Sequence, residues 1–171
     1  EPVRGGSLVF AISADPGTSN QASTTGATDH TLAGLIYEGL TTIAEDFSAE
    51  PCLAESWDIS EDGLTFTFHL VDTTWHDGTP FTSRDVLFTL EEVTKVYSAR
   101  FSAAAALIES MEAPDDRTVV IRLASPYGPF LFSLSAYGGA NILPEHIFRD
   151  TNILENPTSH DQPPGTGPVK L

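Results

Sequence analysis

Apolar and polar residues alternate most regularly within residues 54–81. Apolar side chains occupy every second position of residues 64–70, and this period of two indicates a strand with one buried face. Asp62-Gly63 stands before this run, where glycine supplies the positive φ that a short hairpin loop needs. The pattern therefore predicts a two-stranded hairpin, followed by a second sharp turn at Asp77-Gly78.

An amphipathic helix is expected directly after that second turn. Thr82 can cap its first turn, and Asp85 stands three residues later, which is the spacing of a capping box. The apolar residues that follow lie on one helical stripe: Val86, Leu90, Val93 and Tyr97. This order of elements places a helix behind the hairpin.

Weaker patterns predict the remaining elements. Residues 98–111 are expected to form another helix, because their apolar residues share a helical face and their alanines favour helix. Asp29 is expected to cap an earlier helix that ends at Gly39. The other expected elements are strands at residues 7–13, within 41–51 and at 118–125, short helices at 129–136 and 144–148, and a long loop at 15–27. The predicted fold class is α/β or α+β, with a mixed, largely antiparallel sheet and several short helices.

Charge and cysteine content exclude several classes of protein. The 171 residues carry 24 Asp and Glu against 8 Lys and Arg, a formal net charge of −16. Such a surface repels phosphate backbones and anionic membranes, so we expect no nucleic-acid partner. Because Cys52 is the one cysteine, no disulfide can form within the chain and core packing must hold the fold. No apolar run approaches the ~20 residues that span a bilayer.

Residue types that could carry chemistry have simpler structural roles in this pattern. His69 lies on the polar face of a predicted strand, and Asp77 belongs to a turn, so these two and His76 do not form a metal-ligand set. The chain has no Gly-x-Ser-x-Gly motif, no His-Glu-x-x-His pair and no glycine-rich loop that opens a helix. We therefore expect no catalysis, no metal and no cofactor. Trp57 and Trp75 are expected to anchor the core.

One extended set of residues repeats a known order and spacing: Pro51, Leu53-Ala54-Glu55-Ser56-Trp57, Asp62-Gly63, Thr67-Phe68-His69-Leu70, Trp75-His76-Asp77-Gly78-Thr79-Pro80-Phe81 and Asp85-Val86. This set resembles the signature region of the bacterial extracellular solute-binding proteins of family 5, the peptide- and nickel-binding subunits of ABC transporters. Residues 36–40, 118–125 and 165–171 are similar to the same family.

The resemblance covers the N-terminal part of that family and implies a domain organisation. It assigns residues 1–43 to the first strand and helix of lobe I and residues 44–164 to a subdomain inserted into that lobe. Residues 165–171 would begin a strand that returns to lobe I. Full-length members have two lobes that close on a ligand, so we expect a fragment from which the second lobe is absent.

The same resemblance implies a function and partners. The protein would be the substrate-binding subunit of an ABC importer, which binds peptides or similar small solutes by lobe closure and has no enzymatic activity. Its macromolecular partners would be the membrane permease subunits of the transporter. It would be periplasmic or extracellular, with a signal peptide that is not in the chain. The surface left by the missing lobe could support a dimer.

Five residues are candidates for ligand binding under this resemblance. Thr25, Gly26 and Ala27 match a segment that borders the cleft, where the main chain of an extended ligand can pair with exposed backbone. An ordinary solvated loop is the alternative for these three residues. Phe101 and Tyr137 could offer an aromatic wall to the ligand, or could be packed in the core.

Two other classes of function stay open from the residues alone. One is a fragment of a secreted hydrolase or of a metal-dependent enzyme, since Ser, His and Asp are abundant. The other is an interaction module without a small-molecule cleft. An exposed apolar patch, where another lobe packs, would favour the binding protein over both.

Overall fold

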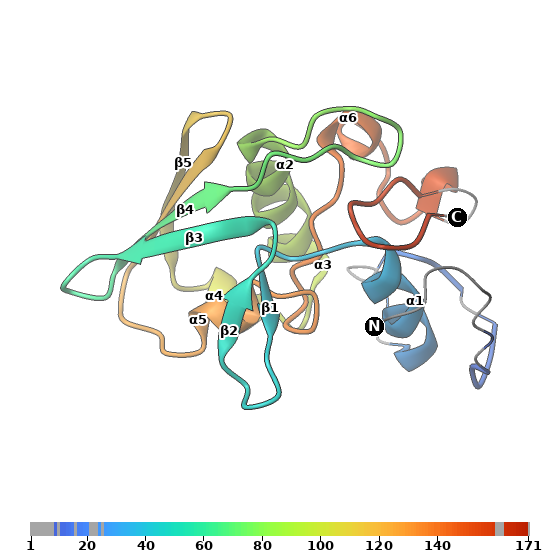
Figure 1. Ribbon diagram of the computed structural model, residues 1–171, viewed down its shortest axis with the longest axis horizontal. Coiled ribbons are helices and arrows are strands. Elements are labelled where there is room, and N and C mark those ends of the chain that lie inside the picture. The colour runs from blue at the N-terminus through green and yellow to red at the C-terminus, as the bar shows by residue number, and fades with distance from the viewer. Residues whose placement is uncertain are drawn as a thin grey trace, which may run out of the picture.

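An antiparallel sheet forms one side of the molecule (Figure 1). The structure is a computed structural model that describes residue 9, residues 11–15, 17–20 and 24, residues 26–159 and residues 163–170. A left-handed Gly63, with a φ of 68°, makes the first turn of the sheet, so the predicted hairpin is confirmed. In spatial order the strands are β3 (Ala54–Ile59), β4 (Thr65–Leu70), β6 (Thr118–Leu123) and β5 (Ile108–Asp115).

The predicted helix at residues 98–111 is wrong. Helix α4 (Ser102–Ala105) is a single turn, and the chain from Ile108 onward forms strand β5. Register shifts interrupt the pairing of β5 with β6, so Ile108 and Met111 both pack against the core although they are three residues apart. A bulged strand thus reproduces the three-residue spacing of a helix face.

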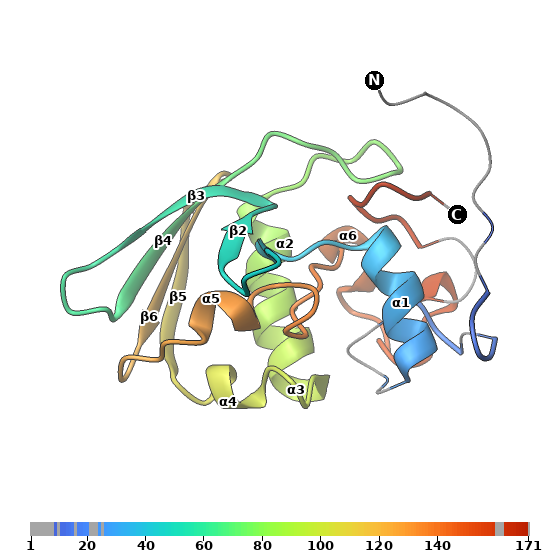
Figure 2. The ribbon, with the colours of Figure 1, turned by 60° about the horizontal axis from the view of Figure 1, so that its bottom comes forward.

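One long helix packs against strands β5 and β6 (Figure 2). It begins as α2 (Ser83–Phe88), continues as the π-helical segment η2 (Thr89–Thr94) and ends as α3 (Lys95–Tyr97). The Asp85 carboxylate accepts the backbone N–H of Thr82 at 2.9 Å, so the predicted capping box is confirmed. The apolar stripe is buried along α2 and η2, but its last predicted member, Tyr97, is exposed.

A small hairpin stands beside the main sheet. It consists of β1 (Thr41–Ile43) and β2 (Ala49–Pro51), and its turn places Phe47 in the left-handed region with a φ of 67°. Helix α5 (Phe130–Ser133) packs against β1, where the Thr41 hydroxyl donates to the Leu131 carbonyl at 2.6 Å. The short helices α6 (Glu145–Phe148) and η3 (Pro157–Ser159) follow. Two antiparallel sheets with short helices confirm the predicted fold class.

Helix α1 (Ala27–Ile36) and residues 163–170 lie side by side, at the end of the molecule away from the sheet (Figures 1 and 2). Gly167 donates its N–H to the Ile36 carbonyl at 2.8 Å, and Val169 donates to the Leu35 carbonyl at 3.1 Å. These bonds satisfy carbonyls at the end of α1 that have no partner within the helix. Residues 163–170 bend at residues 166–168 and are not paired in either sheet.

Both predicted boundaries of the first helix are wrong. Gly26, not Asp29, occupies the N-cap position, and the Asp29 carboxylate instead accepts the Gly17 N–H at 2.7 Å. The helix ends at Ile36, where Tyr37 turns to the extended region. Gly39 instead passes close to another segment: a β-carbon there would lie 2.5 Å from the Leu134 carbonyl oxygen. Of the strand expected at residues 7–13, residues 7, 8 and 10 lie outside the described part, and residues 9 and 11–13 are not in a strand.

The core lies between the main sheet and the long helix and extends to α1. Trp75 is 1% exposed and packs edge-on against Phe81, with ring centroids 5.9 Å apart. Trp57 on β3 is only partly buried, and its ring centroid lies 6.4 Å from that of Phe68. Trp75 is therefore a full core anchor, whereas Trp57 covers the edge of the core.

Candidate functional site

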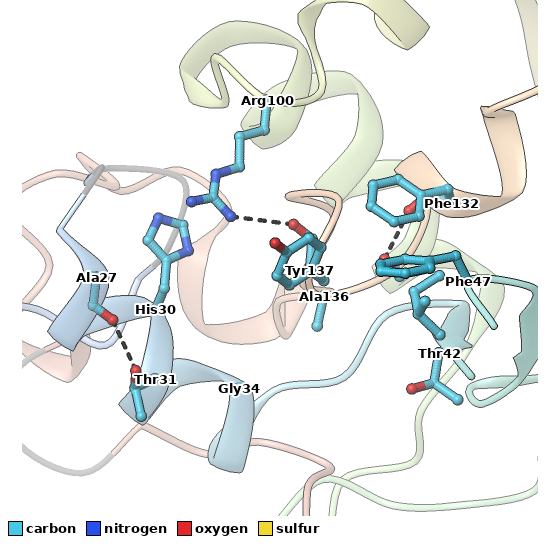
Figure 3. A pocket seen from close by; sticks show the side chains of 12 residues that line it. Ala27, His30, Thr31, Gly34, Thr42, Phe47, Arg100, Phe132, Ala136 and Tyr137 are labelled. Carbon is cyan, nitrogen blue, oxygen red and sulfur yellow. Dashed lines mark hydrogen bonds between the residues drawn. The ribbon is translucent and has the colours of Figure 1, made fainter. Parts of the chain in front are cut away.

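A pocket of about 600 Å³ lies between helix α1 and the β1–β2 hairpin (Figure 3). Its volume is in the range that small-molecule sites occupy. Helix α1 forms one wall, the hairpin a second wall, and α5 with the loop that follows it a third. The lining residues are Ala27, His30, Thr31, Gly34, Thr42, Ile43, Phe47, Arg100, Phe132, Ser135, Ala136 and Tyr137.

Aromatic side chains form the apolar part of the pocket. Phe47, at the tip of the hairpin, is 76% exposed, and Tyr137 is 69% exposed. The rings of Phe132 and Tyr137 meet edge-to-face with centroids 5.8 Å apart. Exposed aromatic rings that line a hollow are uncommon on a surface that nothing covers, and they are typical of binding sites.

Arg100 reaches over the pocket from the segment after α3 (Figure 3). Its Nη1 donates to the backbone carbonyl of Tyr137 at 3.2 Å, and its guanidinium carbon lies 5.9 Å from the centroid of the Tyr137 ring. The hydrogen bond and the cation–π contact hold the side chain in place while it stays exposed to solvent. The pocket thus has a cationic group beside its aromatic wall.

His30 lies on α1 below Arg100 (Figure 3), and its Nε2 lies 3.1 Å from the Thr24 carbonyl oxygen. Burial lowers the pKa of the His30 ring, and the positive charge of Arg100 lowers it further. The ring is therefore uncharged at neutral pH. Because His30 adds no charge, Arg100 provides the formal charge among the lining residues.

The loop before α1 is attached to the helix through Asp29. The Asp29 carboxylate accepts hydrogen bonds from the Gly17 N–H at 2.7 Å and from the Thr24 hydroxyl at 2.7 Å. The Thr24 hydroxyl bond is the largest cause of the lowered pKa of Asp29. An ionised Asp29 therefore positions the loop next to the pocket wall.

The structure distributes the five predicted ligand-binding residues unevenly. Ala27 and Tyr137 line the pocket from different walls, and Gly26 is the exposed N-cap of α1 next to Ala27. Phe101 is 0% exposed and belongs to the core, so its ring faces no cleft. Thr25 lies outside the described residues.

The residue types considered for metal binding make structural contacts. The His76 Nε2–H donates to the Gly167 carbonyl at 2.8 Å, and its Nδ1 accepts the Gly165 N–H at 3.1 Å. Asp77 pairs with His146 at 2.8 Å, and His69 with Asp58 at 3.1 Å. In the part of the chain that the structure describes, no group of three or more His, Cys, Asp and Glu is placed to hold a metal. None of the helices in that part has the length and apolar character to cross a bilayer.

Sequence patterns missed Phe47, Arg100, His30 and Phe132. These residues come from four separate segments, and no local motif joins them. The one available signal was an isolated phenylalanine within the acidic turn at residues 45–50, a position where polar residues are usual.

Comparison with known proteins gives a consistent result. The chain matches the family described as "Bacterial extracellular solute-binding proteins, family 5 Middle" over residues 48–171. A Brucella ovis protein named as an ABC transporter peptide-binding protein is 40% identical over 123 residues, 70% of this chain and 23% of that protein. An Escherichia coli periplasmic protein named for D,D-dipeptide binding is 33% identical over 175 residues, 96% of this chain and 33% of that protein.

A solved structure agrees with these sequences. NikZ from Campylobacter jejuni, crystallised with Ni(L-His), superposes with a TM-score of 0.79 at 32% identity, over 94% of this chain and 32% of that chain. The chain therefore spans about a quarter to a third of the length of these proteins. Because the family match extends over most of the chain, the protein belongs to the bacterial extracellular solute-binding proteins of family 5.

Proposed function

We propose that this chain supplies one wall of the ligand site of an ABC importer's substrate-binding subunit. The pocket between α1 and the β1–β2 hairpin carries the proposal, because it gathers exposed aromatic rings and a cation on one open face. The relatives named above are peptide- or nickel-complex-binding proteins. The ligand would be a peptide or a similar small solute.

In this proposal the chain binds and does no chemistry. Lobe closure would bury the solute between this pocket and a second lobe, and the exposed Phe47 and Tyr137 would then be covered. Transport energy would come from the ATPase of the transporter, whose permease subunits receive the closed protein. With this function the protein would work in the periplasm or outside the cell. The domain division at residues 43/44 and 164/165 is part of the proposal.

The test is a titration of the isolated chain with a panel of di-, tri- and oligopeptides, in which the backbone amide chemical shifts of the protein report binding. We expect weak, millimolar-range binding with shifts at α1, the β1–β2 turn and the Tyr137 loop, because one wall alone buries little of a ligand. Submicromolar affinity would contradict a site shared between two lobes. Shifts confined to the β5 edge would contradict the pocket.

Two glycine variants provide a matched pair. Gly34→Trp places a large side chain in the pocket, and Gly128→Trp places one elsewhere on the surface; a β-carbon has no neighbour within 4 Å at either position. We expect Gly34→Trp to abolish the shifts and Gly128→Trp to keep them. Sedimentation of the chain tests whether the exposed aromatic face also supports a dimer.

A further inference from the structure

We propose that Arg100 binds the carboxylate of an anionic solute, while the adjoining aromatic wall receives the apolar part of the same solute. This inference rests on the proposed function, since it names the class of ligand that the pocket takes. Three observations support it: the ion pairing of the other arginines, the charge of the pocket lining, and the way Arg100 is held.

The other described arginines are paired with carboxylates. Their ion pairs are Arg84–Glu145, Arg117–Asp72, Arg122–Glu109 and Arg149–Glu92. Within the described residues, Arg100 has no carboxylate in ion-pair contact and bonds instead to the neutral carbonyl of Tyr137. In a chain with 24 acidic and 8 basic residues, an arginine without an acidic partner stands out. Its charge is available to a ligand.

The pocket lining favours an anion locally, despite the acidic surface. No Asp or Glu is among its twelve described lining residues. The carboxylate of the nearby Asp29 already accepts hydrogen bonds from the Gly17 N–H and the Thr24 hydroxyl. At physiological ionic strength, salt largely screens exposed charges that lie more than ~8 Å apart. A carboxylate in contact with Arg100 therefore responds mainly to that guanidinium.

The geometry of Arg100 suits a carboxylate. One bond to the Tyr137 carbonyl and the contact with the Tyr137 ring fix the side chain, and the remaining N–H groups of the guanidinium can form a two-pronged contact with two carboxylate oxygens. Because the side chain is already held, less conformational entropy is lost on binding. The Phe132 and Tyr137 rings stand next to it and can pack against an aromatic or aliphatic group.

The test compares two probes that differ at one functional group, which is a charged carboxylate in one and a neutral carboxamide in the other. N-acetyl-L-phenylalanine carries a carboxylate and an aromatic ring, and N-acetyl-L-phenylalaninamide has the same ring without the charge. We expect the acid to bind the full 171-residue chain about tenfold or more tightly than the neutral amide probe, with backbone chemical-shift changes at the pocket for both. Arg100→Gln should remove this preference, so that the two probes bind with similar affinity.

Control variants separate a local contact from overall charge and from misfolding. Arg122→Gln removes the same charge from the outer sheet, where Arg122 pairs with Glu109, and should keep the preference for the acid. Arg100→Lys keeps the charge without the planar fork and should keep a reduced preference. Loss of preference in Arg122→Gln, or a full preference in Arg100→Gln, overturns the inference.

The outcomes also distinguish this inference from the proposed function. Equal binding of acid and amide at the pocket overturns the anion site and leaves the pocket as a solute site. Binding of neither probe, together with no shifts from the peptide panel, overturns both.

Discussion

Gly165 lies against the carbonyl end of helix α1 so closely that a β-carbon at this residue would stand 1.8 Å from the Ile36 carbonyl oxygen. The same glycine donates its N–H to Nδ1 of His76 and accepts the backbone N–H of His76 at 2.9 Å. Two segments far apart in the sequence, α1 and the turn at His76, therefore meet on one glycine. No other residue type fits this contact without movement of the backbone.

Replacing this glycine tests the contact. Gly165→Ala is expected to lower the free energy of unfolding by about 1–3 kcal/mol or more, because the backbone of α1 must move away. Urea unfolding measures the loss. Gly128→Ala is the matched control, because a β-carbon there meets nothing within 4 Å, and it should leave stability nearly unchanged. Equal effects of the two variants would contradict the close contact.

Asp29 is predicted to hold the loop beside the pocket. Asp29→Ala removes the acceptor of the Gly17 and Thr18 N–H groups, so hydrogen exchange at these two amides should become about tenfold faster or more. The pKa of Asp29 is lowered, mainly by the Thr24 hydroxyl, so its contribution is present above the ordinary value of 3.8 and is lost as the pH falls through the lowered value.

Asp46→Ala is the control for the loop. Asp46 makes comparable bonds to the Ser48 N–H and hydroxyl in the β1–β2 turn. This variant should leave exchange at Gly17 and Thr18 unchanged. Unchanged exchange in Asp29→Ala as well would show that the carboxylate does not hold the loop.

Cys52 is predicted to react slowly with alkylating reagents. Burial, with the nearby Glu38 charge as the second cause, raises the pKa of the Cys52 thiol to about 12. At about pH 8 the folded protein should react with iodoacetamide roughly a hundredfold more slowly than the urea-unfolded chain, because the thiolate is the nucleophile. Glu38→Gln removes the negative charge beside the thiol, which donates to Glu38 Oε1 at 3.6 Å, and should speed the reaction. Equal rates for folded and unfolded protein would contradict the raised pKa.

Asp85 is predicted to weaken the fold as the pH rises. Burial raises its pKa above the ordinary 3.8, against the opposing effect of the Thr82 and Glu145 N–H bonds. The folded state then holds a proton that the unfolded state has lost, so the stability that Asp85 contributes is greatest below 3.8 and falls as the pH rises through the raised value. The free energy of unfolding of wild type minus that of Asp85→Asn should therefore decrease from about pH 3.5 to about pH 7.

An exposed aspartate gives the opposite trend as a control. The Ser60 hydroxyl bond lowers the pKa of Asp62, so the stability difference between wild type and Asp62→Asn should increase with pH over the same range. Urea denaturation at several pH values measures both differences. A flat difference for Asp85→Asn would show that its carboxyl is not destabilised by burial.

The sequence predicts those elements that neighbouring residues determine. The β3–β4 hairpin depends on an alternating strand and Gly63, and the start of α2 depends on Thr82 and Asp85, so local patterns are sufficient for both. Strand β5 depends on its pairing with β6, which overrides the helix preference of the alanines before it. Its bulges also hide the period of two that would have revealed a strand.

The candidate site is less predictable, because it also depends on contacts between segments that are distant in the sequence. Family position marks the segment of Ala27 and a small-residue loop marks that of Tyr137, and both residues line the pocket. Arg100 and Phe47 reach the same pocket from segments that only the tertiary fold brings together. Phe101 follows Arg100 directly but is fully buried. Of these two adjacent residues, Arg100 lines the pocket and Phe101 belongs to the core.

The docking of residues 163–170 on α1 has a consequence for biosynthesis. A ribosome releases helix α1 early, and Gly167 and Val169, which donate to its last carbonyls, emerge only after the whole main sheet has been made. The sheet and the long helix can therefore fold first, and the α1 wall of the pocket is completed last, when these two residues arrive.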